Sequence, residues 1–163
     1  MAKNKEEKTN VMRVLEQKKI AYTAHTYPHE EGMAVDGVTV AKSMGFDPVI
    51  VFKTLVARGA SKQYYVFDVP VAENLDLKKA AKAVGEKSIE MIHQKELLPL
   101  TGYVHGGCSP VGMKKLFPTV FHSSAENLAA MIVSAGKIGY QVELAPHDLA
   151  ALVRAKFADI IVE

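Results

Sequence analysis

The feature that most constrains the fold is a pair of apolar stretches separated by a short turn. They read VIVFKTLVA at 49–57 and QYYVFDVP at 63–70, with the turn at 59–62. Their β-branched and aromatic residues favour strands, and the short separation predicts an antiparallel hairpin. Both alternating faces of the first stretch are apolar, as in a strand that is covered on both sides. We therefore expect a central strand of a sheet.

Lys53 stands in the middle of that apolar strand. A buried ammonium without a partner is costly, and burial lowers the pKa of a lysine. Lys53 therefore needs an anion, a carbonyl group or water beside it. Either it pairs with a carboxylate of the core or lies at the exposed end of the strand, or it meets a ligand. The strand alone leaves these alternatives open.

The remaining pattern mixes helices and strands. After an Asn10 cap, helices are predicted at 11–19, 38–45, 76–85, 93–100 and 146–160, and strands at 20–27, 87–92, 118–124, 129–136 and 139–145. In the helix at 76–85 the apolar stripe consists of Leu77, Ala80, Ala81 and Val84. Strands joined by hairpins alternate with helices along the chain. This pattern predicts an α+β fold (mixed α/β) with a mixed, barrel-like sheet and helices around it.

Length and composition bound the class of protein. The 163 residues fit a single domain over 1–163, with residues 1–9 as a flexible lead-in. A net charge of +2 is too small for a general nucleic-acid binder but leaves room for a local basic patch. The single cysteine, Cys108, cannot form an internal disulfide and favours a reducing, cytoplasmic location. No apolar run approaches the roughly 20 residues of a membrane span, and the N-terminus lacks an apolar signal core.

Two glycine-rich segments could present backbone amides to a ligand. GYVHGGCSPVG at 102–112 surrounds Ser109-Pro110 with glycines, and backbone N–H groups exposed in this way suit a phosphate or an oxyanion. MIVSAGKIG at 131–139 adds the Ser134 hydroxyl, Gly136 and Lys137. Neither a P-loop nor a dinucleotide pattern is present. The alternatives without a binding function are a tight turn for the first segment and a hairpin turn for the second.

Histidine and cysteine do not form a recognisable catalytic pattern. Pro28 separates His25 from His29, so a shared helical face and a metal site are not expected. His105, beside the glycines, could act as a general base, but the spacing pairs it with no nucleophile. Cys108 lacks the local signature of a catalytic cysteine and is interpreted as a spare thiol.

Lysines cluster in two places. Lys78, Lys79 and Lys82 follow the polar side of one predicted helix, and Lys114 and Lys115 follow the glycine-rich loop. Each alone is interpreted as part of a solvated face. Together they could hold a phosphate backbone.

An ordered set of motifs resembles the YbaK/EbsC family of aminoacyl-tRNA deacylases, which is similar to the editing domain of bacterial prolyl-tRNA synthetase. The resemblance extends from about Val11 to Ile160 and is closest to the YbaK branch, which acts on cysteine esterified to proline tRNA, Cys-tRNA(Pro). The motifs are HTYPHE, VFKTLV, PVAENLDLKKAAKAVGEKSIEM, TGYVHGGCSPVGMKK, TVF, VSAGKIG and AKFADI.

The resemblance implies a site. Lys53 matches the essential lysine of the family, and Gly106 to Pro110 match its G-x-x-x-P loop, whose backbone holds the terminal adenosine and the ester. Ala135, Ile138 and Gln141 depart from the usual pattern, and Gln141, where Asp is common, bears on the choice of amino acid. The implied substrate-binding residues are Tyr27, Thr54, Gly102, Gly106, Gly107, Ser109, Pro110, Ser134 and Gly136.

The resemblance also implies a function. We expect a trans-editing hydrolase that deacylates mischarged tRNA, most of all Cys-tRNA(Pro), with Lys53 and the loop amides positioning the ester. No metal or organic cofactor is expected. In this branch the thiol of the substrate is proposed to attack its own ester carbonyl, so the protein needs no nucleophile. The expected partners are the acceptor end of tRNA and prolyl-tRNA synthetase, without a membrane. The alternative is a non-catalytic module that binds aminoacyl-tRNA or a nucleotide on the same fold.

Overall fold

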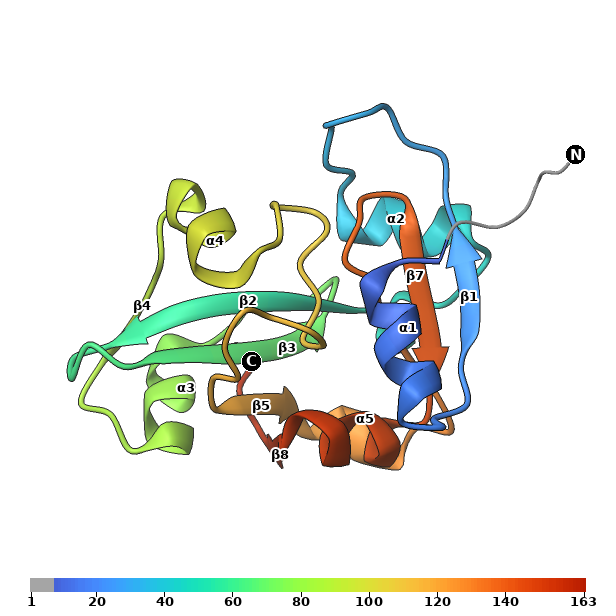
Figure 1. Ribbon diagram of the computed structural model, residues 1–163. Coiled ribbons are helices and arrows are strands. Elements are labelled where there is room, and N and C mark those ends of the chain that lie inside the picture. Colours follow the sequence, from blue (N-terminus) through green and yellow to red (C-terminus); the bar gives the residue numbers. More distant parts are fainter. Residues whose placement is uncertain (1–7) are drawn as a thin grey trace, which may run out of the picture.

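Residues 8–163 are described by the computed structural model, and they form two β-sheets with α-helices around them (Figure 1). One sheet has the strand order β4-β2-β3-β5-β8, and the other has the order β1-β7-β6. The strands are β1 (Thr23–Thr26), β2 (Phe52–Gly59), β3 (Tyr64–Pro70), β4 (Ile89–Met91), β5 (Thr119–His122), β6 (Met131–Ser134), β7 (Tyr140–Leu144) and β8 (Lys156–Ala158).

Four of the five described helices lie close to their predicted positions, and the last one is shorter than predicted. They are α1 (Asn10–Gln17), α2 (Gly37–Ser43), α3 (Leu77–Val84), α4 (Gln94–Thr101) and α5 (Pro146–Val153), with short 3-10 turns η1 (Pro48–Ile50) and η2 (Ser123–Asn127). The N-cap of α1 is Thr9 rather than Asn10, because the extended Thr9 accepts a hydrogen bond from the Met12 amide at 3.3 Å. Residues 1–7, most of the predicted lead-in, lie outside the described part of the chain.

The predicted hairpin is confirmed. Strands β2 and β3 pair antiparallel, with Lys53 opposite Val69 and Thr54 opposite Asp68. The first strand begins at Phe52 rather than at residue 49, because Asp47 caps the 3-10 turn that precedes it. As predicted, β2 is central, since β4 pairs with its other edge.

The C-terminal segment differs from its prediction as a helix over 146–160. Helix α5 ends at Val153, where Arg154 adopts a left-handed conformation with φ of 59°. The chain then forms β8, which pairs in parallel with β5. Phe157 of β8 meets Phe121 of β5 edge to face, with ring centroids 5.9 Å apart. Pairing with a distant strand, and packing upon it, override the local helical pattern.

The α+β class is confirmed, with a mixed five-stranded sheet. Strands β3, β5 and β8 run in parallel, and the other ladders are antiparallel. Within the described residues the strands form two sheets rather than a closed barrel. The sheets meet at a single parallel bridge between Val51 and Ile132. This junction brings the beginning of β2 next to β6.

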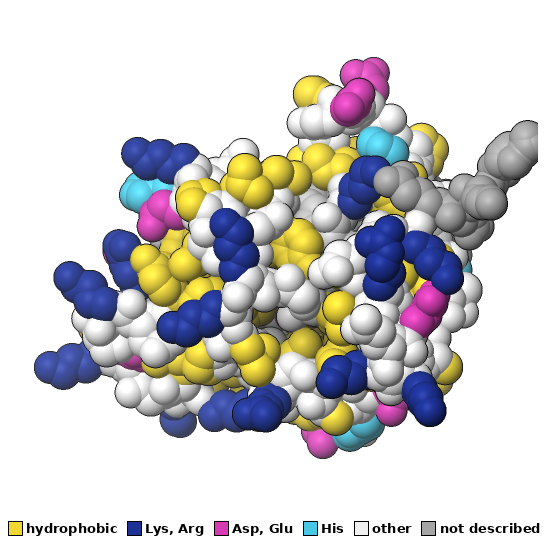
Figure 2. Space-filling view, in the orientation of Figure 1, with side chains coloured by type: hydrophobic (Ala, Val, Ile, Leu, Met, Phe, Trp, Pro, Cys, Tyr) yellow, Lys and Arg dark blue, Asp and Glu magenta, His cyan; other side chains and the backbone are white. Residues whose placement is uncertain are grey.

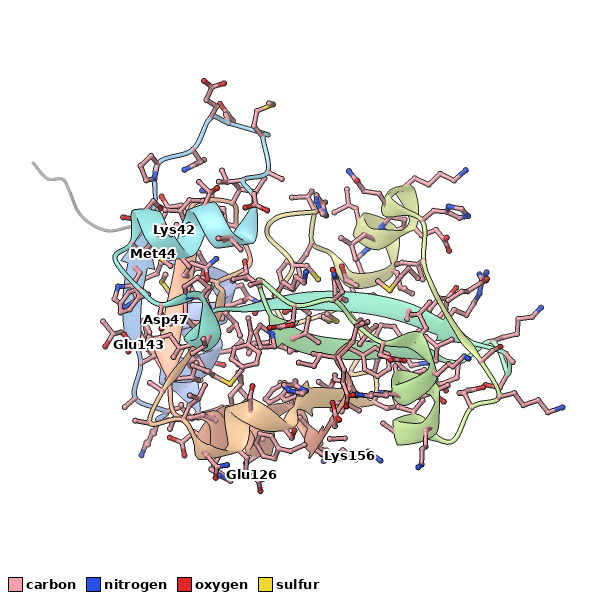
Figure 3. All side chains as sticks on the ribbon, turned by 180° about the vertical axis from the view of Figure 1, so that it is seen from behind. Lys42, Met44, Asp47, Glu126, Glu143 and Lys156 are labelled. Carbon is pink, nitrogen blue, oxygen red and sulfur yellow. The ribbon has the colours of Figure 1, made fainter. Side chains whose placement is uncertain are left out.

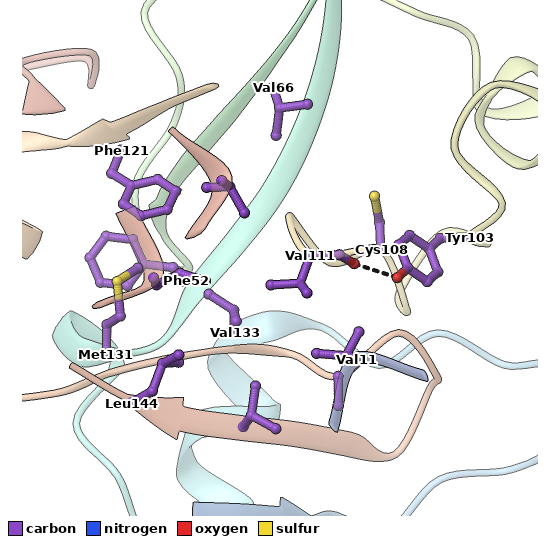
Figure 4. Packing of buried hydrophobic residues seen from close by; sticks show 14 of the residues in the cluster. Val11, Phe52, Val66, Tyr103, Cys108, Val111, Phe121, Met131, Val133 and Leu144 are labelled. Atoms are coloured by element: carbon purple, nitrogen blue, oxygen red, sulfur yellow. Dashed lines mark hydrogen bonds between the residues drawn. The ribbon is translucent and has the colours of Figure 1, made fainter. Parts of the chain in front are cut away.

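Both faces of the five-stranded sheet are covered. On one face Phe52, Val66 and Phe121 pack with α1, α5 and the three-stranded sheet (Figure 4). The other face packs on Ala80 and Ala81 of α3. Leu77, predicted to belong to that stripe, is 41% exposed because it is the first residue of α3. Of the helices in residues 8–163, none has the length and apolarity needed to cross a membrane.

Candidate functional site

The candidate site is a cavity of about 360 Å³ at the junction of the two sheets. Five polar side chains of its wall come from different elements: Tyr27 follows β1, Lys53 and Thr54 belong to β2, and Ser134 and Gln141 belong to β6 and β7. The N-terminal end of α2, Leu97 of α4 and three residues of the glycine-rich loop, His105, Gly106 and Cys108, also line the cavity. Five of the predicted site residues are thus brought together: Tyr27, Lys53, Thr54, Gly106 and Ser134.

The cavity follows an open edge of β2. Strand β4 pairs only with Ala57–Gly59, and β6 meets this part of the chain only at Val51. The Ile92 amide donates to the Val56 carbonyl, so the backbone groups of Val56 point away from β3. The backbone of Thr54, two residues earlier, points to the same side. In the described structure no strand pairs with Thr54 there, and this leaves one backbone donor and one acceptor beside the cavity.

Lys53 lines the cavity with a partly buried side chain and no ion pair. Within residues 8–163, no carboxylate oxygen lies within 4.0 Å of its Nζ. Burial lowers the pKa of Lys53, while the charges of Asp36 and Glu73 act in the opposite direction from a greater distance. The pairing with a core carboxylate, one alternative left open by the sequence, is therefore absent from the described residues. Lys53 is available to an anionic or carbonyl group in the cavity.

Asp68 is a residue of this region that the sequence reasoning missed. It is completely buried, and its Oδ1 accepts a hydrogen bond from the Thr54 hydroxyl at 2.5 Å. Its Oδ2 is buried without a hydrogen-bond partner among the described residues. Burial raises the pKa of Asp68 to about 7, and the bond from Thr54 opposes this only in part. The signal was a carboxylate inside the apolar stretch QYYVFDVP, the same anomaly as Lys53 in the partner strand.

Only part of the glycine-rich loop reaches the cavity. Gly106 lines it with φ of +90°, and a Cβ at this position would lie 2.8 Å from the Cβ of Ala34. Gly107 instead packs on the β6–β7 hairpin, where a Cβ would lie 3.1 Å from the backbone nitrogen of Ile138. Ser109 and Pro110 are buried behind the loop, and Pro110 lines a separate cavity of about 130 Å³.

Gly102 and Gly136 also lie outside the cavity wall. Gly102 ends α4 in a left-handed conformation. Gly136 has φ of +92°, and a Cβ there would lie 2.9 Å from the ring of Tyr103. The hydroxyl of that tyrosine donates to the Val111 carbonyl (Figure 4). The segment 135–139 is a hairpin turn, as the alternative without a binding function predicted, although Ser134 at its start reaches the cavity. The Gly136 amide donates to the Ser134 hydroxyl at 3.2 Å.

Three further cavity residues affect the chemistry that the site can perform. The Oε1 atom of Gln141 is buried and has no partner among the described residues, so it can accept a hydrogen bond from a ligand. Burial raises the pKa of the Cys108 thiol to about 12, which keeps it protonated and poorly nucleophilic near neutral pH. His105 lines the cavity from the exposed part of the loop.

The other histidines do not assemble a metal site. His25 contacts Glu143 across the β1–β7 pair at 2.7 Å and meets Phe46 edge to face. Figure 3 shows Glu143 on the same side of the molecule as Lys42 and Asp47. In the described part of the chain, no three His, Cys, Asp or Glu side chains are grouped so that they could hold a metal ion.

The clustered lysines of α3 have different surroundings. Lys79 is held by Asp159 and Glu163 at 3.1 and 3.4 Å. Lys78 and Lys82 line a shallow depression between α3 and β4. On the face in Figure 2, Lys and Arg side chains are spread around exposed hydrophobic ones, and acidic side chains are fewer. A local basic surface therefore exists despite the small net charge.

The chain has clear relatives. Residues 29–152 match the family described as the aminoacyl-tRNA editing domain. Over 161 residues the chain is 46% identical to EbsC of Enterococcus faecalis, with 98% of each chain covered. EbsC is named as a candidate Cys-tRNA(Pro)/Cys-tRNA(Cys) deacylase.

Solved structures share the fold. One, described as a candidate trans-editing enzyme for prolyl-tRNA synthetase, has a TM-score of 0.80 at 24% identity, over 97% of this chain and 100% of that chain. An epitope scaffold made by computational backbone grafting has a TM-score of 0.82 at 24% identity, over 94% and 95% of the two chains. At this level of identity the similarity supports the fold alone.

Proposed function

The chain belongs to the aminoacyl-tRNA editing domain family, and on that premise we propose that it is a trans-editing hydrolase that deacylates mischarged tRNA. The favoured substrate is Cys-tRNA(Pro), because the relative with 46% identity is named for that ester and for Cys-tRNA(Cys). The observation that carries the proposal is Lys53, a partly buried cation without an ion pair within the described residues, beside a cavity of about 360 Å³. That volume is in the range of small-ligand sites.

The residues of the cavity suit an ester better than they suit a covalent enzyme intermediate. The Lys53 ammonium would attract the phosphate or ribose end of the aminoacyl-tRNA and hold the ester near Gly106 and the open edge at Thr54. Charge that develops on the ester oxygen would be stabilised by these donors. The neutral Cys108 thiol is a poor nucleophile. The thiol of a cysteinyl substrate is therefore the favoured nucleophile. Its sulfur bonds to the ester carbonyl carbon, the bond from that carbon to the ribose oxygen breaks, and the thiol proton passes to the ribose oxygen. Water then opens the released thiolactone to give free cysteine.

The surface is compatible with a tRNA partner. The Lys and Arg side chains in Figure 2 could contact phosphates of the acceptor end, and such contacts would make binding sensitive to salt. We place the protein in the cytoplasm with its tRNA substrate, and we include prolyl-tRNA synthetase as a partner because a protein of this fold is described as acting for that enzyme.

The proposal is tested by incubating the protein with a panel of tRNAs, each charged with a cognate or a wrong amino acid, under single-turnover conditions. We expect rapid deacylation of Cys-tRNA(Pro), a slower reaction with other esters, and loss of the reaction in Lys53→Ala. Tight binding of aminoacyl-tRNA without acceleration of hydrolysis, with or without prolyl-tRNA synthetase, would favour the non-catalytic binding module instead.

A further inference from the structure

Thr54 and Asp68 form a hydrogen-bonded pair across the β2–β3 ladder. The two residues are directly opposite in the β2–β3 ladder, and the Thr54 hydroxyl lies 2.5 Å from Asp68 Oδ1. Thr54 lines the cavity, whereas Asp68 is completely buried behind it. On the other side, Phe121 of β5 occupies the position next to Asp68. Asp68 does not itself line the cavity, and its hydrogen bond from Thr54 links it to a residue that does.

The number of available hydrogens decides whether the Thr54 hydroxyl is a donor or an acceptor toward the cavity. A hydroxyl has one hydrogen to donate and can accept through its oxygen, whereas an ionised carboxylate can only accept. When Asp68 is ionised, the single hydrogen of Thr54 is committed to Oδ1. What remains for the cavity is the Thr54 oxygen, acting as an acceptor.

We propose that Asp68 is a positioning residue that fixes the Thr54 hydroxyl as a hydrogen-bond acceptor for a donor group of the bound aminoacyl ester. The inference rests on the proposed function, because it names the part of that substrate which Thr54 recognises. Two donors lie close to such an ester: the α-ammonium of the amino acid and the free ribose hydroxyl next to the ester. Both offer the same chemistry, and the experiment below distinguishes them.

Protonation of Asp68 reverses this arrangement. A neutral carboxylic acid can donate a hydrogen bond to Thr54, whose own hydrogen then becomes free to point into the cavity. Among the described residues, Cys108 interacts electrostatically with Asp68 and remains a neutral thiol, because its pKa is raised to about 12. The Lys53 side chain leaves the opposite face of β2. Since the pKa of Asp68 is about 7, the Thr54 hydroxyl changes between acceptor and donor toward the cavity near neutral pH.

The test uses a stable substrate analogue, 3′-deoxy-3′-(L-cysteinylamino)adenosine, whose amide replaces the ester. Its dissociation constant is measured by calorimetry from pH 6 to pH 8 with the wild-type protein, Asp68→Asn, Thr54→Val and Thr54→Ser. For the wild type and Thr54→Ser we expect binding to be about three- to tenfold tighter at pH 8 than at pH 6, the scale of one hydrogen bond. Asp68→Asn should show much less change, because its amide oxygen accepts from Thr54 at every pH.

Two further analogues identify the donor. One lacks the amino group, and the other lacks the 2′-hydroxyl. One of these analogues should bind to the wild type and to Asp68→Asn with the same pH dependence. The group that this analogue lacks is the hydrogen-bond donor that contacts Thr54. The amine of the free analogue titrates identically in every experiment, so that contribution cancels in the comparison between proteins. Equal pH dependence in Asp68→Asn and wild type, or equal affinity of Thr54→Val and wild type at pH 8, would overturn the inference.

A second measurement needs no ligand. The carboxyl carbon of Asp68 is followed by ¹³C NMR as a function of pH in the wild type and in Thr54→Val. The Thr54 bond lowers the pKa of Asp68, so the titration should move to higher pH in the variant. An unchanged titration would overturn the inference. Failure of the wild type to bind the analogue, with the NMR coupling intact, would instead count against the proposed function.

Discussion

Lys53 and Thr54 are neighbours in β2 whose side chains leave opposite faces of the strand, and yet both line the same cavity. This is possible because β2 has no paired strand on one side between Val51 and Ala57 in the described structure. The cavity follows this open edge and is reached from both faces of the strand. A cation from one face and a hydroxyl from the other therefore meet one ligand.

Replacement of Lys53 is expected to affect the reaction rather than the fold. Lys53→Ala leaves no carboxylate unpaired, since none contacts Lys53 in the described residues, and it removes a partly desolvated charge. Its free energy of unfolding should be unchanged or slightly higher. Deacylation of Cys-tRNA(Pro) should fall by at least about a hundredfold, the scale of one key electrostatic contact. Lys53→Arg should also fail, because a planar fork does not replace a compact ammonium.

The measurements for Lys53 are a melting curve and single-turnover hydrolysis. Lys42→Ala, on the exposed side of α2, is the matched control and should keep its activity. A loss of about 3–5 kcal/mol in stability would mean that Lys53 forms a buried ion pair. A folded Lys53→Ala protein with normal hydrolysis would remove Lys53 from the mechanism.

Asp68 is expected to make stability depend on pH with a defined sign. Its pKa is raised from 3.8 to about 7 in the folded protein, so folding favours its protonated form. This contribution to the free energy of unfolding is fully present below pH 3.8 and declines as the pH rises. It is lost above about pH 7, and its full size is about 4 kcal/mol. Asp68→Asn does not titrate at this position. Its stability relative to the wild type should therefore increase from pH 5 to pH 8.

Urea unfolding of both proteins at several pH values measures this difference, in which the contributions of other titrating groups cancel. Parallel curves would show that Asp68 ionises in the folded protein as it does in the unfolded chain.

Gly107 is expected to join two loops, and its replacement should lower stability and activity together. Its φ is not positive, so the cost of Gly107→Ala comes from a Cβ 3.1–3.3 Å from the backbone of Lys137 and Ile138. Separating the glycine-rich loop from the hairpin should cost about 1–3 kcal/mol and displace Gly106 from the cavity. Gly85→Ala, at the end of α3, is the control, since it carries only backbone strain and should keep its activity. Loss of activity at unchanged stability would show that Gly107 contacts the ester directly.

Cys108 is expected to be dispensable for hydrolysis. Its thiol stays protonated near neutral pH because its pKa is about 12, and the proposed nucleophile belongs to the substrate. Cys108→Ser and Cys108→Ala should both retain most of the single-turnover rate. An inactive but folded Cys108→Ala protein would require a mechanism in which the enzyme thiol attacks the ester.

Local sequence determined the elements that depend on neighbouring residues. The hairpin of β2 and β3, the central place of β2, the α+β class and the end of α3 at Gly85 follow from alternation, turn residues and caps, which act within a few positions along the chain. The ordered motifs similarly indicated the family. Lys53 was found because a charge in an apolar strand is anomalous wherever the strand finally lies.

Tertiary structure decided what depends on residues distant in sequence. Strand β8 exists because residues 156–158 find β5, a pairing that the local helical pattern did not contain. Gly106 and Gly107 are adjacent glycines that local sequence does not distinguish. Gly106 lies beside Ala34 and the cavity, whereas Gly107 lies beside Ile138 of the β6–β7 hairpin, because these neighbours come from distant parts of the chain. The pKa of Asp68 is raised because the folded structure buries its side chain completely. Burial and pairing across the fold are set by long-range contacts, which local pattern does not encode.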